Sequence, residues 1–142
     1  MIGRFAMEIM ITHINKEDAW KIRHQVMWPE KEFDYIKLAD DDQGIHLGLF
    51  KDQQLISVIS LFVANHTAQF RKFATIEEEQ GKGYGSKLLA YSIQLLQNSG
   101  VKEIWCNARA NKLDYYKKFG LQETNTRYTK GGKSFVIMKK KL

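Results

Sequence analysis

The alternation of apolar and polar residues along the first half of the chain predicts a series of short strands. β-Branched and aromatic residues are frequent in these stretches, and clusters of polar residues separate them. Four candidate strands span residues 4–14, 44–50, 54–64 and 69–76. The polar segments 51–53 and 65–67 are short enough to be tight turns, so we expect an antiparallel meander in the middle of the chain.

Apolar residues at helical spacing predict one helix after the first of these strands. Asn15 is a favourable N-cap, and the apolar residues Ile22 and Val26 follow it until Pro29 ends the pattern. A second, short helix is expected over residues 30–38, before a polar loop.

The pattern changes in the second half of the chain, where a longer helix is expected between two strands. This helix begins after a glycine-rich turn, runs to about Gln97 and buries Leu88, Leu89, Ile93 and Leu96. A strand, a short helix and a hairpin follow over residues 102–108, 111–119, 121–128 and 134–139. The elements together predict an α+β fold, a mostly antiparallel mixed sheet flanked by helices with a central right-handed strand–helix–strand unit.

Length and composition favour one domain, residues 1–142, that needs no disulfide or metal to hold it together. Hydrophobic residues make up 44% of the chain, and the single Cys106 excludes an intramolecular disulfide and a cysteine-cluster zinc site. The longest nearly apolar run, residues 55–64, is too short to cross a membrane, and the start of the chain lacks a signal-peptide pattern. We therefore expect a cytoplasmic protein without metal or membrane partner.

The charge is unevenly distributed along the chain. Residues 1–70 carry seven Lys or Arg against ten Asp or Glu, whereas residues 71–142 carry fifteen against six. The net charges of the two halves are therefore −3 and +9. The basic half favours an anionic partner, unless the charges only cover solvated faces. Nucleic acid is disfavoured as that partner because Lys outnumbers Arg 17 to 5, and Arg is the residue suited to bidentate recognition of bases and phosphates.

The most informative segment is the glycine-rich turn before the longer helix. Gly81, Gly83 and Gly85 alternate with other residues, Lys82 and Lys87 stand beside them, and the turn contains no carboxylate. Backbone N–H groups at a helix N-terminus bind anions, whereas an ordinary first turn favours acidic side chains. The spacing fits neither a Walker A loop nor a dinucleotide fingerprint. We interpret the turn as a phosphate site; the alternative is a connection that only lets helix and strand pack closely.

Two motifs resemble those of the GCN5-related N-acetyltransferases, the GNAT superfamily. Gln80, Gly83 and Gly85 match that family's (Gln/Arg)-x-x-Gly-x-(Gly/Ala) signature, and residues 107–109 followed by 115–121 resemble its closing motif. The expected order of elements fits the family over nearly the whole chain. The resemblance implies an acetyl-CoA-dependent enzyme that transfers an acetyl group to a primary amine, of a small molecule or a protein, by direct attack on the thioester.

The resemblance also implies where acetyl-CoA would lie, between the strands 69–76 and 102–108. Its pyrophosphate would bind backbone N–H groups of the turn, and its pantetheine arm would pair with the main chain of the first strand. The expected cofactor-binding residues are Phe73, Ala74, Thr75, Gln80, Gly81, Lys82, Gly83, Tyr84, Gly85, Ser86, Arg109 and Asn111. Arg109 stands where the family often has an asparagine.

Tyr116 holds the position, four residues before Gly120, at which the family usually keeps its general acid. A phenol can hydrogen-bond to a departing thiolate and protonate it. The alternative is that Tyr116 only packs the last helix. Cys106 lies in the middle of a strand and is expected to be a small core residue, not a nucleophile.

The general base is less clearly marked, and Glu79, near the turn, is our candidate. Its neighbours Glu77 and Glu78, the histidines His13 and His66, and a chain of water molecules are the alternatives. A cationic amine could also be attracted by the acidic residues 40–42, which by default are a solvated charge run.

Two other classes of function compete with the enzyme. The first is a non-catalytic acyl-CoA-binding module with the same fold, which the intact Tyr116 disfavours. The second is a nucleic-acid-binding domain that uses the basic half, but aromatic residues do not alternate with the basic ones. A homodimer is compatible with the sequence.

Overall fold

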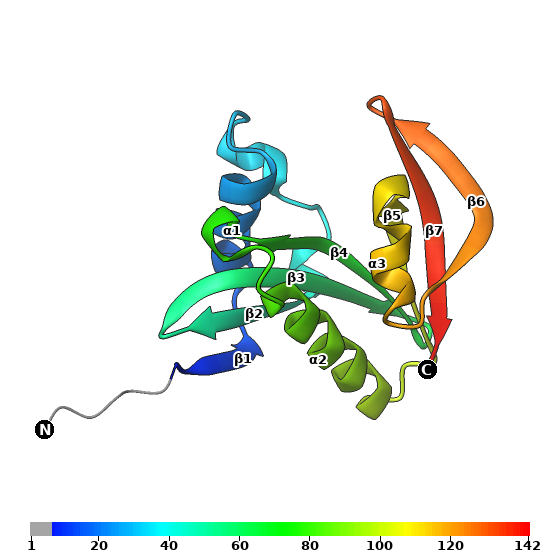
Figure 1. The fold of residues 1–142 in the computed structure, drawn as a ribbon, viewed down its shortest axis with the longest axis horizontal. Coiled ribbons are helices and arrows are strands. Elements are labelled where there is room, and N and C mark those ends of the chain that lie inside the picture. The colour runs from blue at the N-terminus through cyan, green and yellow to red at the C-terminus, as the bar shows by residue number, and fades with distance from the viewer. Residues whose placement is uncertain (1–6) are drawn as a thin grey trace, which may run out of the picture. The chain divides into compact units, whose positions relative to one another are not determined.

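Seven strands form one mixed sheet in the computed structural model, which describes residues 7–142 (Figure 1). The strands are β1 Ile9–His13, β2 Ile45–Lys51, β3 Gln54–Ala64, β4 Thr67–Thr75, β5 Glu103–Arg109, β6 Gln122–Lys130 and β7 Lys133–Lys141. Their order across the sheet is β1-β2-β3-β4-β5-β7-β6. β4 and β5 run parallel, whereas β1 with β2, β5 with β7, and β6 with β7 are antiparallel. The predicted α+β class and mostly antiparallel mixed sheet are therefore confirmed.

Helices, single 3₁₀ turns and tight hairpin turns connect the strands of the described residues. The α-helices are α1 Lys16–Met27, α2 Tyr84–Asn98 and α3 Leu113–Lys117, and the 3₁₀ turns are η1 Phe33–Ile36, η2 Asp41–Gln43, η3 Glu77–Glu79 and η4 Ala110–Lys112. α2 joins the parallel strands β4 and β5, as predicted for the central unit. None of the described helices is long and apolar enough to cross a membrane.

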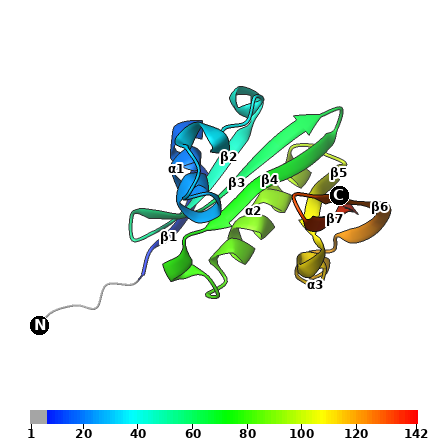
Figure 2. The same cartoon turned by 90° about the horizontal axis from the view of Figure 1, so that it is seen from above.

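The chain forms two compact units, and β3, β4 and α2 each continue from one unit into the other. The first unit contains the described residues up to Ser60 together with Lys72–Tyr91, and the second contains Leu61–Arg71 and Ser92–Leu142. In the first unit, α1 and the start of α2 lie on opposite faces of the sheet (Figure 1, Figure 2). Because both faces are covered, residues 56–60 of β3 are all fully buried instead of alternating.

Three tight hairpin turns have two consecutive residues in the left-handed region, as type I′ turns require. The pairs are Asp52–Gln53, Asn65–His66 and Gly131–Gly132. All three were expected from the sequence as polar interruptions between strands. The first two turns hold this conformation without glycine, which is uncommon and is tolerated best by Asn and Asp.

Three predicted elements are shorter in the structure. Residues 4–6 of the first expected strand lie outside the described residues, and β1 begins at Ile9. The segment 30–38 contains only η1, because Ile36 is its one buried side chain and a longer helix would have no apolar face to bury. The segment 111–119 forms η4 and the five-residue α3, after which Gly120, with φ of +90°, ends the helical conformation.

Arg23 of α1 and Asp41 of η2 form a buried ion pair in the first unit. The two terminal nitrogens of Arg23 donate to the two carboxylate oxygens of Asp41 at 2.8 and 2.9 Å, and the two side chains are 0% and 2% exposed. Arg23 also donates to the Ile36 carbonyl at 3.2 Å and to Ser60 Oγ of β3 at 2.8 Å. The guanidinium therefore joins α1, η1, η2 and the centre of the sheet.

The Asp41 carboxylate also accepts hydrogen bonds from other elements. Trp20 Nε1 of α1 and the backbone N–H of Leu38 both donate to Oδ2 at 2.8 Å. Burial alone would raise the pKa of Asp41, but the hydrogen bonds from Arg23, Trp20 and Leu38 outweigh it and lower the pKa to about 2. Asp41 is therefore a structural anion and not part of a solvated charge run.

We expect the Asp41→Asn substitution to lower the free energy of unfolding by about 3–5 kcal/mol, because it leaves the Arg23 guanidinium buried without its counter-ion. Urea unfolding at neutral pH measures this loss. Asp42→Asn is the control, because Asp42 pairs with Lys16 at the surface and its loss should cost less than about 1 kcal/mol. Equal losses in the two variants would show that the buried pair does not stabilise the fold.

The same ion pair makes stability depend on pH. The pKa of Asp41 is lower in the folded chain than the ordinary value of about 3.9, so its stabilising contribution is complete above about pH 5 and is lost as the pH falls toward 2. This shift corresponds to about 2.5 kcal/mol. In urea unfolding over this range, wild type should lose stability faster than Asp41→Asn, and parallel curves would contradict the assignment.

Candidate functional site

The glycine-rich turn at the start of α2 is open and held in a conformation that only glycine adopts easily. Gly81 and Gly83 have φ of +77° and +86°, and a Cβ atom added at either would meet nothing within 4 Å. Glycine is therefore required here by the backbone conformation and not by crowding. The open side of this turn has room for a ligand group against the main chain.

The charges around this turn suit an anion. α2 begins at Tyr84, its first turn contains no acidic side chain, and the Lys87 N–H closes the first helical hydrogen bond to the Gly83 carbonyl at 3.1 Å. The N–H groups in the first turn of an α-helix generally lack an acceptor four residues earlier, and this end of the helix carries the positive end of its dipole. A phosphate group therefore fits the turn in both charge and space.

Gly85 has a different role from the other two glycines. A Cβ atom at Gly85 would lie 3.3 Å from Phe73 Cζ and 3.3 Å from Thr75 Oγ1, because α2 packs closely against the end of β4. Gly85 therefore permits close packing of the helix against the strand. Gly81 and Gly83 remain the candidates for an anion site.

Hydrogen bonds from neighbouring elements fix the end of β4. Ser57 Oγ of β3 lies 2.8 Å from Thr75 Oγ1 and donates to the Ala74 carbonyl at 3.2 Å. Gln80 Nε2 donates to the Thr75 carbonyl at 2.8 Å, so this signature residue ties the glycine-rich turn back to the strand. Ser57 is not among the site residues predicted from the sequence, although a serine inside a continuous apolar strand indicates a buried hydrogen bond.

One residue of β4 departs from the extended conformation. Lys72 has φ of +54°, which is costly for a residue with a long side chain and interrupts the regular pleat just before Phe73. Such local strain is frequent at functional sites. No sequence signal marks it, because lysine has no preference for the left-handed region.

Glu79 is paired with two lysines. Lys51 Nζ at the end of β2 donates to both carboxylate oxygens, at 2.8 and 3.0 Å, and Lys82 Nζ donates to Oε1 at 3.0 Å. The hydrogen bond from Lys51, then that from Lys82, lowers the pKa of Glu79. A carboxylate with a lowered pKa and two ammonium partners is a poor proton acceptor, which weighs against Glu79 as the general base.

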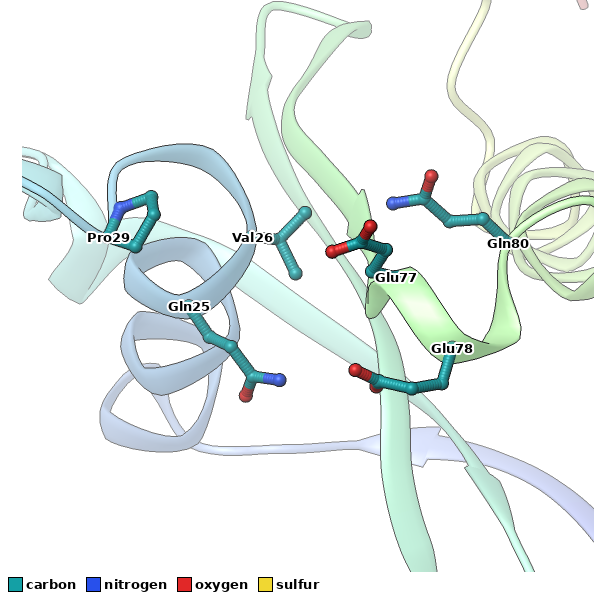
Figure 3. A pocket seen from close by; sticks show the side chains of 6 residues that line it. All are labelled: Gln25, Val26, Pro29, Glu77, Glu78 and Gln80. Atoms are coloured by element: carbon teal, nitrogen blue, oxygen red, sulfur yellow. The ribbon is translucent and has the colours of Figure 1, made fainter.

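The other two glutamates of η3 face a pocket with a volume of about 400 Å³. The pocket is lined by Gln25, Val26, Pro29, Glu77, Glu78 and Gln80. The carboxylates of Glu77 and Glu78 point toward α1 across it (Figure 3). Within residues 7–142, neither carboxylate forms an ion pair. Glu77 and Glu78 therefore give the pocket an uncompensated negative charge, whereas two lysines compensate the charge of Glu79. A protonated amine fits this charge.

Tyr116 lies on α3 in the second unit, among other aromatic rings. Its ring centroid is 5.6 Å from that of Phe70 in β4 and 5.3 Å from that of Tyr115. Burial raises the pKa of the Tyr116 phenol, and Cys106 and Tyr115 add to the rise. The hydroxyl therefore stays protonated over the range in which enzymes work, as a proton donor requires.

The remaining candidates of the second unit lie around β5. Cys106 is buried, which raises the pKa of its thiol to about 12 and agrees with a core residue. Arg109 ends β5 opposite Phe135 of β7, and Asn111 follows in η4; both side chains are exposed.

The remaining candidates from the sequence are His13, His66 and the acidic residues 40–42. His13 and His66 are exposed, and the His66 carbonyl accepts the Lys102 N–H at 2.7 Å. Asp41 is buried against Arg23, so it cannot attract an amine. The expectation of a solvated charge run is therefore wrong for Asp41, whereas Asp40 and Asp42 are exposed.

Comparisons with known proteins identify the family of this chain. The model of the acetyltransferase (GNAT) family matches residues 13–121. The uncharacterized N-acetyltransferase YitI of Bacillus subtilis (strain 168) is 34% identical over 119 residues, which cover 78% of this chain and 80% of the relative. The chain belongs to the GNAT family. The resemblance based on the two motifs is thus confirmed, and the matched region of this GNAT chain includes both of the motif tyrosines, Tyr115 and Tyr116.

Solved structures share the GNAT fold over nearly the whole chain. A candidate N-acetyltransferase from Lactobacillus plantarum has a TM-score of 0.83 at 23% identity. The match covers 97% of this chain and 99% of that one. A GNAT family acetyltransferase from Elizabethkingia anophelis, solved with acetyl-CoA bound, has a TM-score of 0.73 at 18% identity, over 94% and 98% of the two chains. At these identities the likeness supports the fold.

The close approach of α2 to β4 gives a test of the packing in this GNAT chain. We expect Gly85→Val to lower the free energy of unfolding by about 1–3 kcal/mol, because the added side chain overlaps Phe73 and Thr75. Urea unfolding measures the loss. The control is Lys87→Val in the same helix, at an exposed position, which should cost less. A Gly85→Val variant as stable as wild type would contradict the close packing.

Proposed function

We propose that this chain is an acetyl-CoA-dependent N-acetyltransferase that transfers the acetyl group to a primary amine of a small molecule or a protein. The observation that carries the proposal is the open turn at Gly81 and Gly83, at a helix N-terminus without acidic side chains. Membership of the GNAT family supports the reaction class.

The main chain would do most of the cofactor binding. Backbone N–H groups from Gly81 to Ser86 would hold the pyrophosphate, and the main chain of residues 73–75 would pair with the pantetheine arm as an added strand does. Gln80 supports this arrangement by tying the turn to the end of β4. Arg109 and Asn111 are exposed polar residues that we assign to the same cofactor. Acetyl-CoA itself supplies the acetyl group, activated as a thioester.

Tyr116 would supply the proton that the departing thiolate needs. Because its pKa is raised, the phenol is neutral at physiological pH and can donate without first being protonated. The attacking amine must lose a proton before it forms the new C–N bond. Since Glu79 is paired with two lysines, Glu77, Glu78 or water are better proton acceptors for that step.

The pocket between α1 and η3 supports a cationic acceptor. Its two carboxylates, Glu77 and Glu78, oppose the charge of an alkylammonium group, and Val26 and Pro29 give an apolar wall for the carbon chain. Recognition of the protonated form would concentrate the amine near the enzyme before deprotonation.

Binding of CoA tests the phosphate turn. In Gly83→Asp, a side chain with a negative charge enters the proposed pyrophosphate path, so we expect the dissociation constant for CoA to rise at least about 100-fold by isothermal titration calorimetry. Gly132→Asp is the matched control, because Gly132 also has a positive φ and an open Cβ direction but lies in the β6–β7 turn. Unchanged CoA affinity in a folded Gly83→Asp variant would remove the basis of the proposal.

Turnover tests the role of Tyr116 separately from binding. Tyr116→Phe keeps the ring that packs against Phe70 and deletes the hydroxyl, so kcat should fall about 10²–10⁴-fold while the KM for acetyl-CoA changes little. Tyr115→Phe is the control and should keep near-wild-type kcat. Because the pKa of Tyr116 is raised, wild-type kcat should not fall through its ionisation up to about pH 10.

These two experiments also separate an enzyme from a binding module. A protein that binds CoA through the turn but consumes no thioester with any amine of a broad panel would be a non-catalytic acyl-CoA-binding module. Wild-type kcat in Tyr116→Phe, measured where chemistry limits the rate, would instead leave the enzyme but return Tyr116 to a packing role.

A further inference from the structure

Three charged side chains from separate elements meet beside the glycine-rich turn. They are Lys51 at the end of β2, Glu79 in η3 and Lys82 between the two glycines of positive φ. Glu79 accepts from both ammonium groups through Oε1, at 2.8 Å from Lys51 Nζ and 3.0 Å from Lys82 Nζ. We call these residues the Lys–Glu–Lys cluster. The net charge of the cluster is +1. Its Lys82 lies within the turn that is proposed to bind the pyrophosphate.

The two lysines of the cluster are not held equally. Lys51 Nζ binds both oxygens of Glu79 and lies 5.6 Å from the centroid of the Tyr84 ring, and its side chain is 25% exposed. Lys82 binds a single oxygen, and its side chain is 51% exposed, whereas that of Glu79 is 12% exposed. The Lys51–Glu79 pair is therefore the firmer of the two, and the Lys82 ammonium is the one that can leave.

We propose that Glu79 is a positioning residue that holds the Lys82 ammonium beside the turn and gives it up to a phosphate of CoA when the cofactor binds. Lys51 stays on Glu79 and neutralises it, so no unpaired carboxylate is left next to the bound anion. The proposal rests on the proposed function, because it needs CoA at the turn. It also gives Glu79 a role in cofactor exchange instead of proton transfer.

An exchange of this kind limits how tightly CoA binds. Lys82 must break its ion pair with Glu79 before it reaches the phosphate. The cost of breaking this pair offsets part of the attraction between Lys82 and the phosphate. Acetyl-CoA and the product CoA carry the same phosphates, and both are affected. Glu79 thereby favours release of the product, which an enzyme of this reaction must accomplish in every turnover.

The Glu79→Gln substitution tests the exchange by the sign of its effect. Removal of the carboxylate frees Lys82 in advance, so the dissociation constant for CoA should fall about two- to fivefold at low ionic strength, the range expected for a half-exposed ion pair. The gain should shrink as salt is raised, because screening weakens both attractions. With saturating substrates, kcat should fall by no more than about the same two- to fivefold factor, because the substitution slows only the release of CoA and Glu79 does not accept the amine proton.

Two further variants isolate the cluster. Glu78→Gln removes the same charge one residue away, from a side chain without a lysine partner, and should change CoA affinity less than Glu79→Gln does. In a Lys82→Met background, CoA should bind more weakly than to wild type, and Glu79→Gln should then produce no more than the effect of Glu78→Gln. Glu78 and Lys82 are exposed, whereas the Glu79 side chain is 12% exposed, and circular dichroism checks that all the variants fold.

Weaker or unchanged CoA binding in Glu79→Gln would overturn the proposal, because a merely structural carboxylate would show that result. An equal gain in Glu78→Gln would also overturn it, by reducing the effect to general charge. A 100-fold loss of kcat in Glu79→Gln would make Glu79 the base instead. The proposed function fails on a different measurement, namely wild-type CoA binding that is absent or insensitive to Gly83→Asp.

Discussion

The buried ion pair between Arg23 and Asp41 is the interaction on which the first unit depends. A guanidinium without exposure to water requires its counter-ion and further acceptors to be in place together, and these come from η1, η2 and β3. Formation of the pair therefore fixes the position of α1 against the sheet. The same helix carries Gln25 and Val26, which line the pocket opposite η3. Because Gln25 is only two residues from Arg23, the ion pair also fixes the position of this wall of the pocket.

Local rules allowed much of the fold to be predicted from the sequence. Asn15 caps α1 through the Asp18 N–H, and the polar interruptions between strands became tight turns. Those signals depend on a few neighbouring residues, and so can be recognised without knowledge of the fold. Elements that depend on distant contacts were predicted poorly. The short η1 reflects how little of its segment the sheet covers, and the acidic residues 40–42 contain a carboxylate whose partner, Arg23, lies 18 residues earlier.

The candidate site shows the same division. The glycines of the turn were recognised because their spacing before a helix has a direct physical meaning, and the structure separates them into two with positive φ and one that permits close packing. The surroundings of Glu79 could not be predicted, because its firmest partner, Lys51, lies 28 residues away at the end of another strand. Proximity along the chain favoured a proton acceptor at Glu79. Proximity in space gave it two ammonium partners.

The burial of Cys106 has a practical consequence for the study of this protein. It is the one cysteine of the chain, only 2% of it is exposed, and its thiolate is disfavoured at any pH used in assays. Disulfide reagents react with thiolates, so the folded protein should be nearly silent toward them. In assays of the proposed function, free CoA liberated from acetyl-CoA can thus be followed continuously by the colour of a thiol-reactive reagent, without a background from the protein and without modifying it.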